Sequence, residues 1–185
     1  MISDKINLAL KVASRAHRDQ TRKGTDIPYV AHPVAVAMII SKYTTDENTI
    51  IAGILHDILE DVRSAVYSEI DMKNDFGDEV VGIVKDVSED KTAGELEKPW
   101  IERKKGYLSH LDNIEDKKPL IVSTADKIHN LTDILEEYGR VGDDIWQKFN
   151  ADKDDELWFY SEFLKIIKKK QIPEQMKIDL TLLVN

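Results

Sequence analysis

The sequence predicts an all-α protein that folds as one helical bundle. Apolar residues recur at spacings of three and four along most of the chain, the pattern of one buried helix face. No stretch alternates apolar and polar residues as a half-buried strand would. Most glycines and prolines fall where the helical spacing stops. Because 185 residues suit one domain and no repeat or linker divides them, we expect residues 1–185 to form a single domain.

Each expected helix follows from its own run of apolar spacing. We expect helices at residues 6–17, 32–43, 44–61, 66–76, 78–87, 100–114 and 119–138, then an aromatic helix around residues 158–163 and a short amphipathic one after residue 173. Thr44 and Glu47 have the form of a capping box, and Gly77 and Gly139 suit helix ends. Residues 21–31 and 88–99 are expected to be loops, the second a mobile one.

Composition excludes several classes of protein. The chain has no cysteine, so a bound metal would have to be held by His, Asp or Glu side chains. A net charge of −9 argues against a nucleic-acid partner, and a small anionic substrate would need a local basic cluster or a bound cation. No run reaches the roughly 20 apolar residues of a membrane span. The N-terminus does not have the pattern of a signal peptide, so we expect a cytoplasmic protein. The sequence does not indicate an oligomeric state.

The segment from His56 to Asp61 carries the strongest chemical signal. His56, Asp57, Glu60 and Asp61 interrupt a helix that is otherwise apolar. An imidazole nitrogen and a neighbouring carboxylate suit a cation of the manganese, iron or zinc class when no thiolate is available. Glu60 and Asp61 follow the His-Asp pair by one turn, where a carboxylate can accept a proton from water made acidic by a metal.

Two further candidate ligands interrupt other apolar helices. His32 opens the second expected helix, and Asp126 lies within the long helix over residues 119–138. A lone His or Asp in such a place is more often a cap or a surface residue. Together with the His56-Asp57 pair, however, they favour one metal site over four unrelated polar residues.

These segments resemble the HD-domain hydrolases of the RelA/SpoT type, including the small alarmone hydrolases. The resemblance follows the family order through residues 16–33, 53–61, 76–91, 103–108 and 125–131. It implies an HD-domain helical bundle and a Mn²⁺ ion held by the residues that match the family ligands, namely His32, His56, Asp57 and Asp126. It also implies that Glu60 and Asp61 activate the attacking water.

The same resemblance implies a nucleotide site. Arg22, Lys23 and Tyr29 lie in the family's nucleotide-binding loop, where a basic pair and an aromatic ring contact base, ribose or phosphate. Asn130 matches a residue on the ribose side, and Lys127 is a candidate for phosphate. We expect His17 to be a packed core histidine. We expect His129 to point away from the site.

The expected function is therefore hydrolysis of guanosine tetra- or pentaphosphate, (p)ppGpp, to GDP or GTP and pyrophosphate. Two alternatives stay open: an HD-type phosphohydrolase that acts on another nucleotide, and a nucleotide sensor without turnover. The first is kept because Asp86 to Lys91 place acidic residues where alarmone hydrolases tend to have Gly-Val-Thr-Lys. Val62 likewise replaces the usual threonine after the acidic pair.

Overall fold

The structure is a computed structural model that describes residues 2–89 and 98–185. Within these residues it is helical and contains no β-strand, only an isolated bridge between Thr21 and Pro28, so the predicted all-α class is confirmed. The helices are α1 (Asp4–Ala16), α2 (Ala31–Ile40), α3 (Glu47–Leu55), α4 (Ile58–Asp61), α5 (Glu69–Phe76), α6 (Asp78–Val87), α8 (Trp100–Asn113), α9 (Lys117–Val141), the 3₁₀ helix η1 (Gly142–Lys148), α10 (Lys153–Lys169) and α11 (Glu174–Val184).

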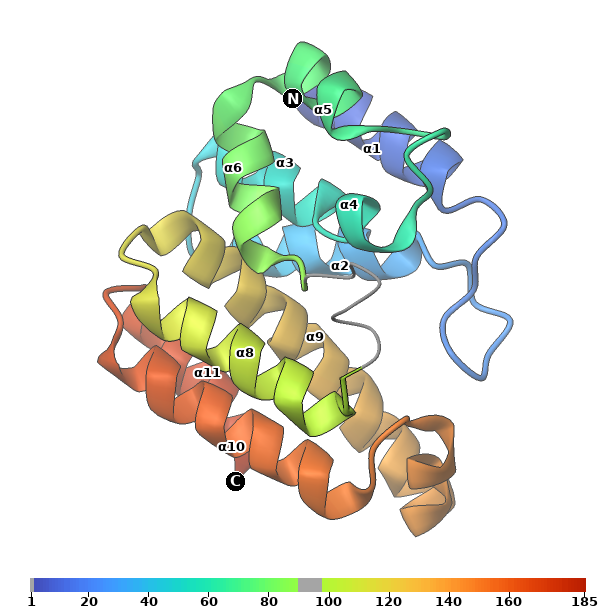
Figure 1. Ribbon diagram of the computed structural model, residues 1–185, viewed down its shortest axis with the longest axis vertical. Coiled ribbons are helices and arrows are strands. Elements are labelled where there is room, and N and C mark those ends of the chain that lie inside the picture. The colour runs from blue at the N-terminus through green and yellow to red at the C-terminus, as the bar shows by residue number, and fades with distance from the viewer. Residues whose placement is uncertain (1, 90–97) are drawn as a thin grey trace.

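The long helix α9 is the element around which the others are arranged (Figure 1). It contacts α2, α3 and α6 of the N-terminal half, and also η1, α10 and α11 that follow it. Its buried residues run from Pro119 to Ile134, so one helix supplies core to both halves. Removing such apolar side chains from water is the main force that holds the bundle together. Asp126 lies among these buried residues, and its position is therefore fixed by the core.

The third expected helix differs from the prediction at both ends. Thr44 and Glu47 do not form a capping box: Asp46 is the N-cap, and its side chain accepts a hydrogen bond from the backbone N–H of Thr49 at 2.9 Å. The expected continuous helix to Asp61 is wrong as well. It divides into α3, which ends at Leu55, and the short α4, with a turn at His56 and Asp57 between them.

Of the two helix ends predicted from glycines, one is confirmed and one is wrong. Gly77, at φ 88°, ends α5 as expected. Gly139 does not end α9, which continues to Val141 and stops at Gly142, where φ is 61°. η1 was not predicted, because its seven residues are too few to show a helical period. Most of the expected loop over residues 88–99 lies outside the described residues.

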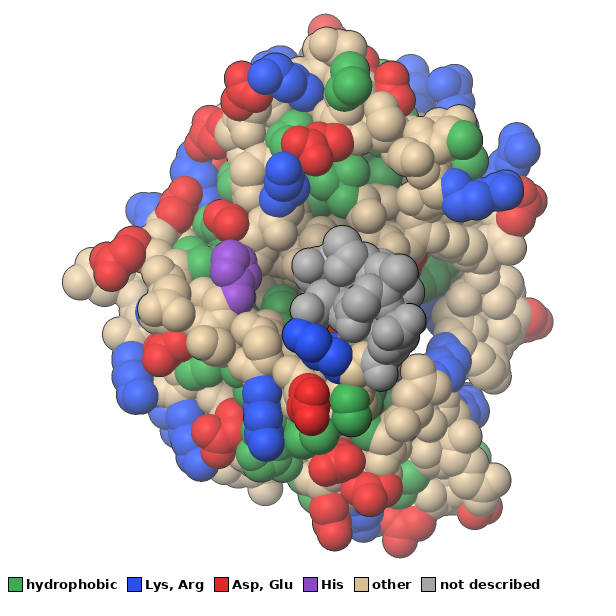
Figure 2. All heavy atoms as spheres, in the orientation of Figure 1, with side chains coloured by type: hydrophobic (Ala, Val, Ile, Leu, Met, Phe, Trp, Pro, Cys, Tyr) green, Lys and Arg blue, Asp and Glu red, His purple; other side chains and the backbone are tan. Residues whose placement is uncertain are grey.

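The basic loop over residues 21–31 is closed and held against the C-terminal part of the chain. Arg22 donates its backbone N–H to the carbonyl of Ile27 at 2.8 Å. Gly24 has a φ of 73°, and a Cβ atom there would lie 2.9 Å from Cε of Lys148 in η1. The positive φ favours glycine at this turn, whereas the flexible Lys148 side chain can move aside for a larger residue. On the face drawn in Figure 2, acidic and basic side chains are interspersed, so the basic character of this loop is a local feature.

Among the described residues, no helix is both long enough and apolar enough to cross a membrane.

Candidate metal centre and nucleotide pocket

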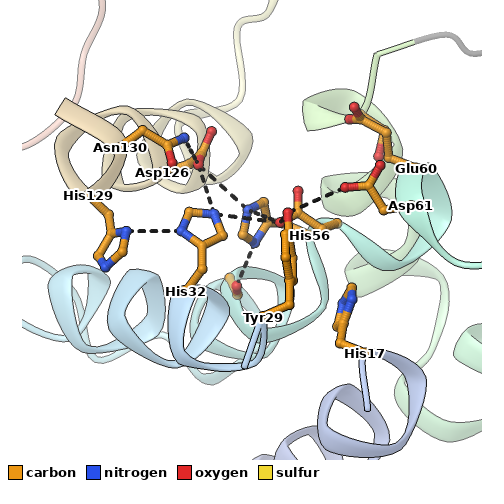
Figure 3. Close-up of polar contacts among 12 residues, drawn as sticks. His17, Tyr29, His32, His56, Glu60, Asp61, Asp126, His129 and Asn130 are labelled. Atoms are coloured by element: carbon orange, nitrogen blue, oxygen red, sulfur yellow. Dashed lines mark hydrogen bonds and ion pairs between the residues drawn. The ribbon is translucent and has the colours of Figure 1, made fainter. Parts of the chain in front are cut away.

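Four predicted ligands from three parts of the chain meet at one point (Figure 3). His32 lies in α2, His56 and Asp57 form the turn between α3 and α4, and Asp126 lies in α9. Nε2 of His32 is 3.1 Å from Oδ1 of Asp126 and 3.5 Å from Oδ2 of Asp57. Nε2 of His56 is 3.2 Å from the same Asp57 oxygen and 3.8 Å from the same Asp126 oxygen. We call these four residues the His-Asp group.

The geometry of the His-Asp group fits one cation. The ligand atoms of His32, His56 and Asp57 lie within 4.8 Å of one another. Atoms bound about 2 Å from one ion are separated by about 3 Å, close to the observed nitrogen–oxygen distances. Within the described residues, Nε2 of His56 is buried and makes no hydrogen bond. A buried nitrogen facing two carboxylates without a hydrogen bond is suited to binding a metal.

The second nitrogen of each histidine is held by a neighbour. Nδ1 of His56 lies 2.8 Å from the carbonyl of Gly53, to which it donates, so Nε2 is the nitrogen that faces the group. Nδ1 of His32 lies 3.0 Å from Nδ1 of His129. The expectation that His129 points away is thus wrong, because helix α9 turns that ring towards α2. It helps to orient His32.

The Asp126 carboxylate is held on both of its oxygens. Nδ2 of Asn130 donates to Oδ1 at 2.6 Å, and Nζ of Lys127 donates to Oδ2 at 2.5 Å. Burial raises the pKa of Asp126, but the charge of Lys127 and contacts with both histidines outweigh it, so that pKa lies well below its ordinary value. Asp126 is therefore ionised and ready to bind a cation. The structure places Lys127 and Asn130 beside a candidate ligand as well as in the pocket.

Asp57 is held by the predicted nucleotide-loop residue Tyr29. The Tyr29 hydroxyl donates to Oδ2 of Asp57 at 2.7 Å and lies 3.3 Å from Oδ2 of Asp61. Burial, followed by the charges of Asp57 and Asp61, raises the pKa of Tyr29 well above its ordinary value. The phenol therefore keeps its proton and remains a hydrogen-bond donor. His17 stacks on the Tyr29 ring with centroids 4.8 Å apart and is buried, as expected.

The electrostatics of the group favour a bound positive charge. Burial alone lowers the pKa of His56, but the nearby Asp57 and then Asp126 reverse the effect and raise it to about 9. The same carboxylates lower the free energy of a divalent cation at this point, and that cation would replace the imidazolium proton.

Glu60 and Asp61 lie on α4, immediately beyond the group. Both line the same polar pocket as the four ligands, a cavity of about 180 Å³ that we call the polar pocket. Oε2 of Glu60 accepts the backbone N–H of Glu89 at 3.1 Å. The backbone carbonyl of Asp61 accepts Nε2 of Gln20 at 3.0 Å. The expected acidic pair is thus placed within reach of a water molecule in this pocket.

A larger cavity of about 540 Å³ adjoins the polar pocket. Arg22, Tyr29, His32 and Asn130 line both cavities, so the two are neighbours that share one set of side chains. Nη2 of Arg22 donates to Oδ1 of Asn130 and to Oδ2 of Asp133, each at 2.9 Å. Its guanidinium carbon lies 5.8 Å from the centre of the Tyr29 ring.

Lys23 lines the larger cavity only, at some remove from the metal group. Its Nζ donates to Asn150 at 3.2 Å and lies 6.0 Å from the centre of the Phe149 ring. The predicted loop residues are therefore divided between the two cavities. Arg22 and Tyr29 reach the polar pocket, whereas Lys23 is held towards the segment after η1.

Sequence reasoning missed three charged residues of the site. Asp133 holds Arg22, and Glu89 and Lys104 line the polar pocket. Lys104 lies in a run of basic residues, Arg103 to Lys105, on a helix that carries no other candidate site residue. Its spacing carried no signal of a role in the site, because its partner Glu89 comes from a different element.

Comparison with known proteins identifies the family of this chain. A family model described as "HD domain" matches residues 9–156, a stretch that contains all four members of the His-Asp group. The chain belongs to the HD-domain family. HD domains bind a divalent metal, and this HD domain presents a His-His-Asp set for one.

Within the family, the relatives are of the RelA/SpoT type. The HD domain is 36% identical over 129 residues to the guanosine-3′,5′-bis(diphosphate) 3′-pyrophosphohydrolase MESH1 of Xenopus tropicalis, a match covering 68% of the chain and 67% of MESH1. It is 38% identical over 128 residues to a GTP pyrophosphokinase of Streptomyces coelicolor, covering 68% of the chain but 14% of that protein. Bifunctional (p)ppGpp synthase/hydrolase SpoT of Escherichia coli is 32% identical over 127 residues, covering 69% of the chain and 18% of SpoT.

Solved structures show the same fold. A metazoan SpoT orthologue described as hydrolysing ppGpp superposes with a TM-score of 0.79 at 24% identity, covering 99% of this HD domain and 95% of that chain. The protein lmo0812 of Listeria monocytogenes superposes with a TM-score of 0.70 at 27% identity, covering 85% and 93%. The expected HD-domain bundle is therefore confirmed.

Proposed function

We propose that this HD domain is a metal-dependent 3′-pyrophosphohydrolase that converts (p)ppGpp to GDP or GTP and pyrophosphate. One observation carries the proposal: the cavity that holds the His-Asp group and an acidic pair lies next to a basic, aromatic cavity, and Arg22, Tyr29, His32 and Asn130 line both. The activity named for MESH1, the relative that the chain matches over two thirds of its length, supports the substrate.

His32, His56, Asp57 and Asp126 are the proposed ligands, and Mn²⁺ is the proposed ion. Two imidazoles and two carboxylates are borderline and hard donors, a combination that suits Mn²⁺ as well as iron or zinc. A divalent cation held there supplies charge that polarises a phosphate oxygen and makes a nearby water more acidic.

Glu60 and Asp61 are the proposed proton acceptors. Water forms the new bond to the phosphorus next to the 3′ oxygen, the bond between that oxygen and phosphorus breaks, and the 3′ oxygen leaves with a proton. The hydroxyl of Tyr29 lies 3.3 Å from Oδ2 of Asp61. This contact restricts the Asp61 carboxylate to the side of the Tyr29 loop that faces the polar pocket. Such positioning would favour proton transfer from a water molecule bound in the same pocket.

The nucleoside is proposed to occupy the larger cavity. Its volume of about 540 Å³ lies within the range typical of small-molecule sites. Lys23, Arg22 and Tyr29 would contact the base and its neighbouring phosphates, since Arg and an aromatic ring both stack on planar groups. Asn130 would face the ribose, and Lys127 a phosphate of the substrate in the polar pocket.

The proposal is tested by incubating Mn²⁺-loaded protein with ppGpp and separating the products chromatographically. We expect GDP and pyrophosphate in equal amounts. Asp57→Ala and Glu60→Gln should each reduce kcat/KM by at least about 100-fold, because they remove a metal ligand and a proton acceptor. Asp75→Asn, at an exposed carboxylate on α5, is the matched control and should leave the rate unchanged.

A nucleotide panel in the same assay separates the alternatives. If ppGpp stays intact while another 2′-, 3′- or 5′-phosphorylated nucleotide is cleaved, that nucleotide is the substrate instead. Tight ppGpp binding without turnover by any metal-loaded sample would instead indicate a sensor.

A further inference from the structure

Every basic side chain at the polar pocket is already paired with a carboxylate. Among the described residues that line it, the Lys and Arg side chains are Arg22, Lys104 and Lys127. Arg22 pairs with Asp133, Lys127 with the candidate ligand Asp126, and Lys104 with Glu89. An anionic substrate can therefore use these cations fully only by taking the place of a resident carboxylate.

Glu89 is the resident carboxylate most firmly held by cations. Nη1 of Arg103 donates to its Oε2 at 3.1 Å, and Nζ of Lys104 donates to Oε1. Its side chain is only 11% exposed. Burial raises the pKa of Glu89, but the charge and hydrogen bond of Lys104, followed by Lys127 and Arg103, outweigh burial and lower it. The carboxylate is therefore ionised at neutral pH.

Glu89 also stands between two cavities. With Tyr107 it lines both the polar pocket and a side cavity of about 250 Å³, which Arg103 and the half-exposed His110 line as well. Nε of Arg103 is buried and has no hydrogen-bond partner among the described residues. Arg103 therefore keeps an unsatisfied guanidinium donor while its side chain lines the side cavity.

Aromatic rings help to hold the Lys104 ammonium group in place. Nζ of Lys104 lies 5.0 Å from the centre of the Phe159 ring and 5.7 Å from that of Trp100. These aromatic faces attract the ammonium group and restrict its stem. Lys104 is therefore positioned by aromatic side chains of α8 and α10 as well as by its pair with Glu89.

We propose that Arg103 and Lys104 form a subsite for a diphosphate group, and that Glu89 occupies it as a competing anion that the diphosphate must displace. A carboxylate carries one negative charge, whereas a diphosphate carries more charge and several acceptor oxygens. Displacement therefore favours diphosphates over singly phosphorylated groups. The inference deepens the proposed function and rests on it for the identity of the nucleotide that carries the diphosphate.

The test measures binding of inorganic pyrophosphate and of inorganic phosphate by calorimetry, on full-length protein with the same excess of free Mn²⁺ in every sample. Glu89→Gln should tighten pyrophosphate binding by about tenfold or more, because it removes the competing charge and leaves two partly buried cations to be neutralised. Phosphate binding should tighten less. Glu89→Asp, which keeps the charge, should stay within about threefold of the unchanged protein.

Two further variants complete the design. Adding Lys104→Gln to Glu89→Gln should cancel the gain, whereas Glu162→Gln, which breaks an exposed pair with Lys165 on α10, should change nothing. Thermal melting of each variant checks that it is folded. Equal pyrophosphate affinity in folded Glu89→Gln and unchanged protein would overturn the proposal and leave Glu89 as a structural ion pair.

The experiment distinguishes failure of the diphosphate subsite from failure of the proposed function. Pyrophosphate binding does not require hydrolysis of ppGpp, so a tenfold gain in Glu89→Gln together with intact ppGpp would reject the nucleotide and keep the diphosphate subsite.

Discussion

Tyr29 connects the nucleotide loop to the candidate metal centre through one hydroxyl group. That group contacts both Asp57 and Asp61, while the ring stacks on His17. A carboxylate ligand that also accepts a hydrogen bond has fewer orientations to lose when it binds a cation. The phenol thus contacts a candidate metal ligand even though it lies in the predicted nucleotide loop.

Removal of this hydroxyl should weaken the metal site. We expect Tyr29→Phe to reduce Mn²⁺ affinity or kcat by about 10- to 100-fold, the usual effect of losing a hydrogen bond to a ligand. Metal affinity is measured by calorimetry and the rate at saturating Mn²⁺. Tyr67→Phe, which loses a comparable hydrogen bond to exposed Asp75, is the control. Equal metal affinity and kcat in Tyr29→Phe and the unchanged protein would contradict this role.

The residue types in the sequence predicted the candidate ligands, but they did not predict the residues that support the site. His32, His56, Asp57 and Asp126 stood out because each is polar within an apolar run, and the structure brings them together. Their identity as ligands stays a prediction. Glu89 and Asp133 gave no such signal, because each takes part in the site only through an ion pair with a residue distant in the sequence.

At the scale of elements, the break between α3 and α4 turns the His56-Asp57 pair towards the pocket. The sequence pattern is continuous across this break, so periodicity alone predicted one helix. Gly53 lies one turn before it, and its carbonyl accepts Nδ1 of His56. A Cβ atom at Gly53 would lie 2.3 Å from Cδ1 of the fully buried Ile40.

A methyl group at Gly53 should therefore force α3 away from α2. We expect Gly53→Ala to lower the free energy of unfolding by about 1–3 kcal/mol, because overpacking outweighs the better helix propensity of alanine. Gly82→Ala on the exposed face of α6, where a Cβ atom meets nothing within 4 Å, should raise it by about 0.5–1 kcal/mol. Denaturant unfolding measures both. A stabilised Gly53→Ala would show that Ile40 moves aside without cost.

Strong periodicity predicted which helices exist, whereas their ends depended on local contacts. The ranges 78–87 and 100–114 agree with α6 and α8 to within one residue. The Asp46 cap and the continuation of α9 past Gly139 were missed. Glycine is compatible with a helix interior where packing continues, so its presence alone does not determine a helix end.

On the scale of the whole molecule, the His-Asp group joins α2 and the α3–α4 turn to α9. A ligand that binds only the folded state stabilises it by mass action, by about 2.7 kcal/mol at 100 times its dissociation constant. For a chain of this size we expect Mn²⁺ at that excess to raise Tm by roughly 5–10 °C. Scanning calorimetry with and without chelator measures the shift, and Asp126→Asn should abolish most of it. An equal Tm in both conditions would argue against a metal held by these residues.

The contacts of α9 with helices before and after it support the proposal that residues 1–185 form one domain. The HD-domain match itself ends at residue 156. Cytoplasmic localisation and the lack of a nucleic-acid partner stay predictions.

The ligand candidates also set an order of events during synthesis. Asp126 follows His32 by 94 residues, and the His56-Asp57 turn lies between them. At the usual pace of translation, about 5–20 residues per second, roughly 5–20 s pass between synthesis of the first ligand and the last. On the ribosome, the emerging N-terminal helices must pack without a complete cation site. If these four residues hold a cation, all of them are available to it only after α9 has left the exit tunnel.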